Sequence, residues 1–140
     1  MSKNVDTLRQ AHNAFSEGDH LRSASMIADS FEFTDHGRQQ SAHSRAEFQG
    51  WLDEHKKMSS NMQIVDAVYI DGGDYVTARF RAVGVQDGAT PMFPVSNREF
   101  SLDVCEVWKF NAEGQAIEAH NYADSLGLMI QLGHISPPQT

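Results

Sequence analysis

Carboxylates and a histidine lie close together in the C-terminal part of the sequence. Glu106, His120 and Asp124 fall in two segments, 100–110 and 115–124, whose side chains alternate as in half-buried strands. A carboxylate in apolar surroundings is a stronger base than one in water, because desolvation raises its pKa. Together with a histidine as proton donor, such a group can remove a carbon-bound proton beside a carbonyl and stabilise the resulting oxyanion.

The sequence between these two segments predicts which side chains meet. Asn111-Ala112-Glu113-Gly114 is typical of a hairpin loop closed by a glycine with positive φ. In that register Glu106 faces His120 and Leu102 faces Asp124, and the same face carries two further pairs, Trp108 with Glu118 and Val104 with Tyr122. A slip of one residue would move Asp124 to the opposite face, so the prediction depends on this turn.

We expect this face to line a small-molecule pocket, in which a few polar groups converge on an apolar wall. The alternative is that Glu118 and His120 lie at a hydrated edge and only Asp124 points inward. A second candidate is the dipeptide Asp35-His36, which follows the strand containing Phe33. Residues after strand ends are often functional, although a hydrated turn explains the same dipeptide.

Other reactive residue types give weaker signals. Cys105 is the only cysteine, which excludes an internal disulfide, and its mid-strand position favours a packed side chain over a nucleophile. No pair of the seven histidines has a convincing metal-ligand spacing. We predict neither a metal site nor a cofactor, since no glycine-rich phosphate loop is present.

The pattern of apolar residues predicts the elements that position these groups. Helices are expected at 5–17, 19–28, 44–58 and 125–133, the third begun by the capping box Ser44-Arg45-Ala46-Glu47 and carrying Trp51 on its apolar stripe. Strands are expected at 31–37, 62–71, 74–85, 95–110 and 115–124. This order predicts one α+β domain over residues 1–140, with a flexible tail at 134–140.

Composition excludes several classes of function. The 140 residues include 11 Lys and Arg against 19 Asp and Glu, a net charge of −8. Such a chain repels nucleic acid and anionic membranes. No segment is long and apolar enough to span a membrane, and the first residues lack the apolar core of a leader. We therefore expect a soluble cytoplasmic protein.

The segments quoted above, together with Tyr122-Ala123-Asp124 and the later Gln131-Leu132-Gly133, resemble the SnoaL-like polyketide cyclases of the nuclear transport factor 2-like superfamily. The resemblance implies a cone-shaped, curved antiparallel sheet whose concave face is covered by three N-terminal helices, with a short C-terminal helix. It also implies a cofactor-independent cyclase, a lyase or isomerase type of enzyme that acts by intramolecular aldol chemistry on a small apolar or polycyclic ligand. Asp124 matches the catalytic acid/base, and His120 and His36 match polar pocket positions. The remaining expected substrate contacts are Phe33, Asp35, Trp51, Leu102, Val104, Glu106, Trp108 and Tyr122.

Other functions of the same fold stay open. Tyr122, Asp124 and Glu106 could form a ketosteroid-isomerase-type site, and an arginine such as Arg79 with Asp103 could form an epoxide-hydrolase-type site. A non-catalytic ligand-binding or dimerisation module is the third alternative, with the ionisable groups as a mutually satisfied network.

A homodimer is the expected assembly. The second face of the 95–124 hairpin carries small residues that could pack on another sheet, and the helices can cover only one face. These residues are Ser101, Cys105, Val107, Ile117, Ala119 and Ala123.

Overall fold

The computed structural model describes residues 3–91 and 93–139. The helices are α1 (Lys3–Ser16), α2 (His20–Ser23), the 3-10 turn η1 (Ala24–Met26), α3 (Arg45–Met58) and α4 (Ser125–Gln131). The strands are β1 (Ile27–Asp35), β2 (Gln40–Ala42), β3 (Gln63–Gly72), β4 (Tyr75–Val85), β5 (Glu99–Phe110) and β6 (Ala116–Ala123). None of the helices in the described ranges combines the length and the apolarity needed to cross a bilayer.

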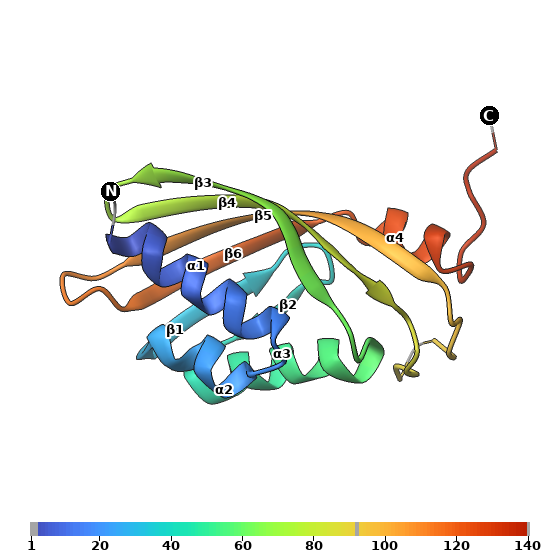
Figure 1. Cartoon of the computed structure of the whole chain (residues 1–140), viewed down its shortest axis with the longest axis horizontal. Coiled ribbons are helices and arrows are strands. Elements are labelled where there is room, and N and C mark those ends of the chain that lie inside the picture. Colours follow the sequence, from blue (N-terminus) through green and yellow to red (C-terminus); the bar gives the residue numbers. More distant parts are fainter. Residues whose placement is uncertain (1–2, 92, 140) are drawn as a thin grey trace.

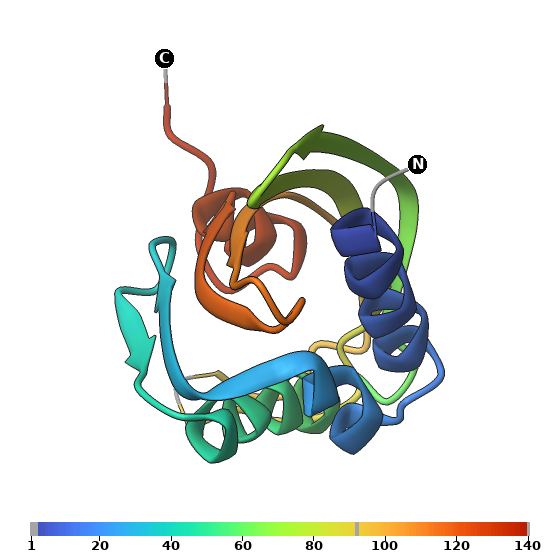
Figure 2. The same ribbon diagram turned by 90° about the vertical axis from the view of Figure 1, so that its left-hand side faces the viewer.

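The six strands form one curved sheet in the order β2-β1-β6-β5-β4-β3. All neighbours are antiparallel except β1 and β6, which run parallel, so the expected antiparallel sheet is in fact mixed. Figure 1 shows α1 and α3 beneath the long strands and α4 at the far end of the sheet. The end-on view shows the sheet curling toward these helices without closing into a barrel (Figure 2). The α+β fold expected from the sequence is confirmed.

Local sequence signals account for several element boundaries. Helix α3 begins after Ser44, whose hydroxyl accepts from the Glu47 amide at 3.1 Å, whereas the Glu47 carboxylate bonds the His43 amide rather than that of Ser44. The expected helix 19–28 was too long, since α2 ends at Ser23 and β1 already begins at Ile27. Ile27 is fully buried, so its side chain packs in the core under the sheet and does not belong to the apolar face of a helix. The short strand β2 was not predicted.

The hairpin β5–β6 contains a bulge that changes its register. The turn itself is as predicted, with Gly114 at φ 80° and Asn111 paired to Gln115 through N–H···O at 2.9 Å. Phe110 then pairs with Ala116, but Lys109 pairs with Glu118, which leaves Ile117 as an extra residue on β6. The predicted pairings of Glu106 with His120 and of Trp108 with Glu118 are therefore wrong.

The bulge follows from packing on the concave face. Large aromatic side chains of β5 need small partners, and Trp108 lies opposite Ala119 while Phe110 lies opposite Ala116. All four residues are almost completely buried. Without the bulge, Glu118 and His120 would be forced into this core, where an unpaired ionised group is very costly.

Candidate active site

Three polar residues form a row across the concave face of the sheet. Asp35 on β1 pairs in register with Asn121 on β6, and Asn121 pairs with Glu106 on β5. All three side chains are buried, with exposed fractions of 2%, 6% and 6%. Because residues in register on adjacent strands share a face, these side chains enter the interior together with the aromatic core. Buried polar groups in this position mark the candidate active site.

Glu106 is the centre of a closed hydrogen-bond network. Its Oε1 accepts from Trp108 Nε1 at 3.1 Å and lies 3.0 Å from His12 Nε2 on α1, while its Oε2 accepts from Asn121 Nδ2 at 2.9 Å. Burial alone would raise the pKa of Glu106, but the hydrogen bonds and charge of His12, with those of Asn121 and Trp108, hold that pKa below its usual value. Glu106 is therefore an ionised, acceptor-only group at neutral pH.

The network continues from His12 to Tyr69 on β3. His12 Nδ1 lies 2.7 Å from the Tyr69 hydroxyl. An ionised Glu106 requires His12 Nε2 to be the donor, so in neutral His12 the Nδ1 atom accepts from Tyr69. Burial, together with the charge of Glu106, raises the pKa of Tyr69 to about 12, although Arg9 opposes this shift. Tyr69 thus keeps its proton at neutral pH.

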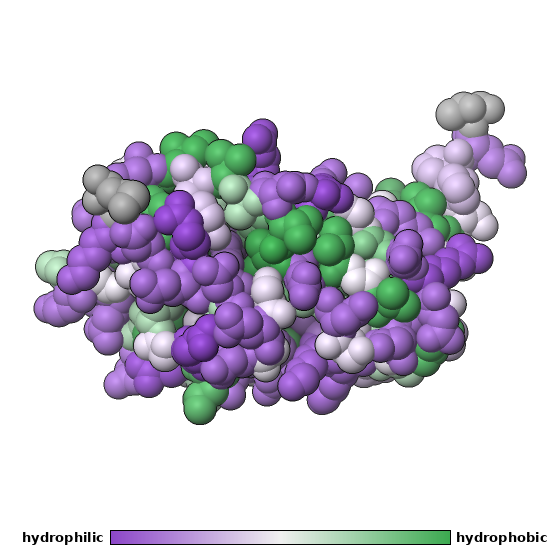
Figure 3. Space-filling model, in the orientation of Figure 1, coloured by the Kyte–Doolittle hydropathy of each residue, from purple (hydrophilic) through white to green (hydrophobic). Residues whose placement is uncertain are grey.

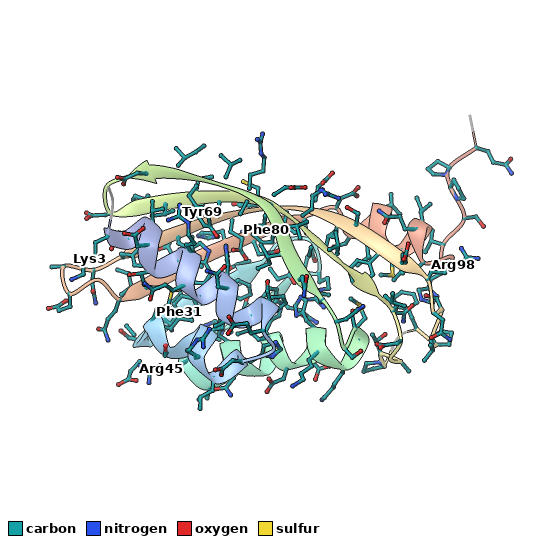
Figure 4. The ribbon with its side chains drawn as sticks, viewed as in Figure 1. Lys3, Phe31, Arg45, Tyr69, Phe80 and Arg98 are labelled. Atoms are coloured by element: carbon teal, nitrogen blue, oxygen red, sulfur yellow. The ribbon has the colours of Figure 1, made fainter. Side chains whose placement is uncertain are left out.

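The elements around this network place Tyr69 and His12 at the junction of α1 and the sheet. Tyr69 and Phe80 project from β3 and β4 toward α1 (Figure 4), and the His12 ring packs edge-on against Phe80 with centroids 4.9 Å apart. Arg9, one turn earlier in α1, lies over the Tyr69 ring at 5.0 Å. Figure 3 shows apolar residues on the nearby surface. They lie in the middle of this view, over β3 and β4.

Asp35 organises a second group at the edge of α3. Its Oδ2 accepts from Arg38 Nε at 2.8 Å and from Trp51 Nε1 at 3.0 Å. Arg38 also contacts His55 Nε2 at 3.2 Å, and His55 Nδ1 donates to the Trp51 carbonyl at 2.7 Å. Burial, followed by the charge of Arg38, lowers the pKa of His55 from 6.5 to about 4. This group joins the β1–β2 turn to α3 through an ion pair and a neutral imidazole.

Most of the apolar residues expected to contact substrate lie on the concave face. Phe33, Val104 and Trp108 are buried there, and Leu102 and Trp51 pack against the same core while staying partly exposed. Glu106 and Asp35 also point inward, as their registers show. Their role toward a substrate stays a prediction.

Asp124 does not lie in the expected position. It follows β6 directly, is exposed, and caps α4, with its Oδ1 accepting from the Gly127 amide at 2.9 Å. The premise of its catalytic role, a place in an apolar cavity beside Leu102 and Val104, is wrong. The bulge at Ile117 and the end of the strand at Ala123 together explain the difference.

His36, His120 and Tyr122 lie on the outer, convex face of the sheet. His120 pairs in register with Val107 rather than Glu106. His36 Nε2 lies 2.9 Å from His120 Nδ1, and His120 Nε2 lies 3.0 Å from Glu118. The Tyr122 ring stacks on His36 at 4.4 Å. The two histidines therefore meet, but outside the pocket in which we expected them, and Tyr122 is 48% exposed.

The sequence reasoning missed His12, Tyr69 and Asn121. His12 follows Ala11 within the apolar stripe of α1, next to Leu8 and Phe15, and a histidine in a buried stripe was a usable signal. Asn121 was missed because the predicted register, in which His120 faces Glu106, turns the Asn121 side chain away from the concave face. Within residues 3–91 and 93–139 no cluster of three or more His, Cys, Asp or Glu side chains is arranged to hold a metal ion.

Comparison with known proteins identifies the family. The model of a family described as SnoaL-like domain matches residues 8–119, which is more than half of the chain. The chain belongs to the SnoaL-like domain family. No curated protein matches this SnoaL-like domain.

Solved structures confirm that SnoaL-like domains share this fold. A putative polyketide cyclase from Xanthomonas campestris pv. campestris is similar with a TM-score of 0.83 and 20% identity over 92% of this chain and 96% of that one. IdmH, a putative polyketide cyclase from Streptomyces antibioticus, has a TM-score of 0.80 and 21% identity over 94% and 99%. A protein with a ketosteroid isomerase-like fold from Catenulispora acidiphila, solved with trimethylamine, has a TM-score of 0.79 and 16% identity over 96% and 98%. At these identities the likeness shows the fold alone.

Proposed function

We propose that this SnoaL-like domain binds a small apolar carbonyl compound and transfers a proton on it through Tyr69, His12 and Glu106. The observation that carries this proposal is the unbroken line of hydrogen bonds from the Tyr69 hydroxyl through His12 to Glu106. A carboxylate that orients an imidazole, which in turn faces a hydroxyl, is the arrangement by which many enzymes activate a weak acid or base.

The proton transfer uses only groups of this chain. A carbon-bound proton beside the ligand carbonyl passes to the Tyr69 oxygen while the Tyr69 proton passes to His12 Nδ1. The ligand becomes an enolate, Tyr69 is again a neutral phenol, and His12 becomes an imidazolium paired with Glu106 at 3.0 Å. The enolate then attacks a second carbonyl of the same molecule, and its alkoxide product takes the proton back along the same path.

Glu106 supports this step through its ionised state rather than as the base itself. Its lowered pKa makes it a weak base, but its negative charge stabilises the imidazolium and fixes the tautomer of His12. Tyr69, whose pKa is raised to about 12, delivers or receives the proton only when His12 moves the second one. Such relayed acid–base catalysis contributes roughly 10² to 10⁴ in rate.

Intramolecular cyclisation is the reaction class we propose, with a polyketide-like, polycyclic or other apolar ligand in the cytoplasm. The names of the two structural neighbours from Xanthomonas and Streptomyces support it, as do the apolar side chains around Glu106. An apolar carbonyl compound suits this surface because its only polar atoms are those that react.

The experiment follows proton exchange rather than a particular product. Deuterium incorporation beside the carbonyl of α-tetralone, measured by NMR in D2O, reports enolate formation without knowledge of the natural substrate. We expect the protein to accelerate this exchange and Tyr69→Phe and His12→Phe to lose the acceleration by at least tenfold. Tyr75→Phe is the matched control, because Tyr75 is an exposed tyrosine on the neighbouring strand. Equal rates for Tyr69→Phe and Tyr75→Phe would overturn the relay.

A second candidate is a ligand-binding module without catalysis. One observation favours it. Every fully buried side-chain nitrogen and oxygen in the described ranges has a hydrogen-bond partner, so the Glu106 network is complete without a ligand. In a purely structural network, Glu106→Gln leaves His12 facing a neutral amide and lowers the free energy of unfolding by about 3–5 kcal/mol. Chemical denaturation measures this loss. If the wild-type protein also leaves the rate of deuterium exchange on α-tetralone equal to the rate in buffer alone, the binding module is favoured.

We also propose that two copies associate through the convex face of the sheet. Large apolar side chains are exposed there, namely those of Val68, Ile70, Tyr75 and Tyr122. Three of the small residues expected on this face are misplaced, because Ala119 is buried in the core, Ala123 packs against it and Ile117 forms the bulge. The proposed interface therefore rests on the larger exposed residues. Light scattering at micromolar concentration tests it, with Ile70→Lys expected to give the mass of one chain.

A further inference from the structure

A cavity separate from the Glu106 network opens where α1 and α3 end. Its volume is about 190 Å³, enough for a ligand of several heavy atoms. Its lining comes from the end of α1, the α1–α2 turn, the end of α3 and the start of β3, and includes Phe15, Glu17, His20, Lys56, Ser59 and Asn61. Gly18, also in the lining, has open space where a side chain would stand. None of these residues belongs to the proposed proton relay.

His20 is the buried polar group at this cavity. Its side chain is only 7% exposed, and its Nδ1 lies 3.1 Å from Asp53 Oδ1. Its ring stacks on Phe15 with centroids 5.2 Å apart and planes 10° from parallel. The Asp53 carboxylate can only accept, so Nδ1 is the donor and Nε2 of the neutral ring carries a free lone pair.

The second ring nitrogen of His20 is free to accept a hydrogen bond. In the described part of the chain, Nε2 has no hydrogen-bond partner, and no fully buried side-chain nitrogen there lacks one, so Nε2 is partly accessible. His20 lines this cavity, which offers a space in which a donor can reach Nε2. A carboxylate-oriented imidazole with one free acceptor nitrogen is a site for a hydrogen-bond donor.

The helix ends at the cavity favour a cationic donor. Helices α1 and α3 both end there, and the C-terminal end of a helix carries partial negative charge on its last carbonyl groups. The Glu17 carboxylate at the rim is paired with Arg22 at 2.6 Å, so these two full charges offset each other. Lys56 is the remaining opposing charge, and it lies exposed in the last turn of α3.

We propose that this cavity binds the primary ammonium group of a small ligand, with His20 Nε2 accepting one of its three N–H bonds. The ammonium head points toward His20 and the ends of the two helices, and the short organic part packs against Phe15 and Met62. A quaternary ammonium ion carries the same charge but has no N–H to donate, so it lacks the bond to His20.

The experiment compares propylammonium with its N-trimethyl analogue at pH 8, where an ordinary histidine is neutral. Amide chemical shifts of Gly18, His20 and Asn61 report binding by NMR. We expect propylammonium to give saturable shifts and the trimethyl analogue to bind at least tenfold more weakly. His20→Phe keeps the ring stack but should lose the preference, whereas Lys56→Met should tighten binding several-fold by removing the like charge.

The outcomes separate this site from the proposed proton transfer. Tyr69→Phe should leave amine binding unchanged, because the relay takes no part in it. Equal affinity for the two amines in the wild-type protein, or an unchanged preference in a folded His20→Phe variant, would overturn the proposal. The wild-type comparison decides the question even if His20→Phe does not fold.

Discussion

Asn121 lies directly opposite Glu106 and donates from Nδ2 to its Oε2 at 2.9 Å. This pair exists only because Ile117 is bulged out of the β5–β6 ladder, which turns Asn121 inward and His120 outward. The same residues in an unbulged hairpin would have produced a His–Glu pair on the concave face. The position of one extra residue therefore decides which groups form the candidate active site.

Asp124 gives a prediction that separates capping from catalysis. Asparagine caps helices about as well as aspartate, so Asp124→Asn should keep α4 and leave proton exchange on α-tetralone unchanged. Asp124→Ala removes the acceptor for the Gly127 amide and should lower the free energy of unfolding by about 1 kcal/mol. A loss of exchange by several powers of ten in Asp124→Asn would restore the catalytic role expected from the sequence.

His55 gives a prediction about pH. Its pKa is about 4 in the folded protein against 6.5 when unfolded, so between these values the unfolded chain binds more protons. Above pH 6.5, the titration of His55 therefore leaves the free energy of unfolding unchanged. This free energy falls as the pH drops from 6.5 toward 4, by at most about 3 kcal/mol. Denaturation at a series of pH values measures this slope.

His55→Gln should flatten the slope. His43 provides the control, because the hydrogen bond that it donates to the Glu32 carboxylate raises its pKa instead. Replacing His43 should leave the loss of stability between pH 6.5 and 4 in place. A slope that persists unchanged in His55→Gln would contradict the assignment.

Gln131 gives a prediction about the edge of β5. Beyond the end of β6, its side chain accepts from the Ser101 amide at 2.8 Å and donates to the Ser101 carbonyl at 3.0 Å. Gln131→Ala should cost about 1–2 kcal/mol for the two bonds, and Gln131→Glu more, because its carboxylate would face a carbonyl oxygen. Hydrogen exchange at the Ser101 amide should accelerate in both variants, and an unchanged rate would contradict this role.

Ala119 gives a prediction about the packing behind the bulge. It is 1% exposed and lies opposite Trp108, so Ala119→Leu should lower the free energy of unfolding by about 1–3 kcal/mol through overpacking. Ala112→Leu, in the exposed β5–β6 turn, adds the same atoms without this contact and should be nearly neutral. Thermal unfolding of the two variants would show whether the concave face requires a small residue here.

Features with local causes were predictable from the sequence. The capping box at Ser44, the turn at Gly114 and the alternation in 74–85 gave α3, the hairpin loop and β4, with the boundaries of α3 and β4 correct to within one residue. Each depends on residues close in sequence, where side-chain preference and backbone geometry act directly. The family resemblance, which the family model confirms, gave the overall fold.

The content of the site depended on contacts distant in sequence. The bulge at Ile117 results from the need for small residues opposite Trp108 and Phe110, which a reading of each strand by itself does not show. The parallel pairing of β1 with β6 joins segments some 85 residues apart, and His12 meets Glu106 across 94 positions. The alanines at 116 and 119 were the available signal, since they lie opposite the large aromatic side chains of Phe110 and Trp108.

Strand β3 contains a bulge between its pairs Val65–Arg81 and Val68–Arg79, and this bulge affects how the protein behaves in concentrated solution. This strand ends the sheet, and it exposes Val68 and Ile70. Two residues before Val68, the backbone turns to positive φ at Asp66, whose carboxylate pairs with Arg81. A kinked edge strand that carries a charged pair is a poor template for another chain, so Asp66 and Arg81 protect the molecule from edge-to-edge aggregation.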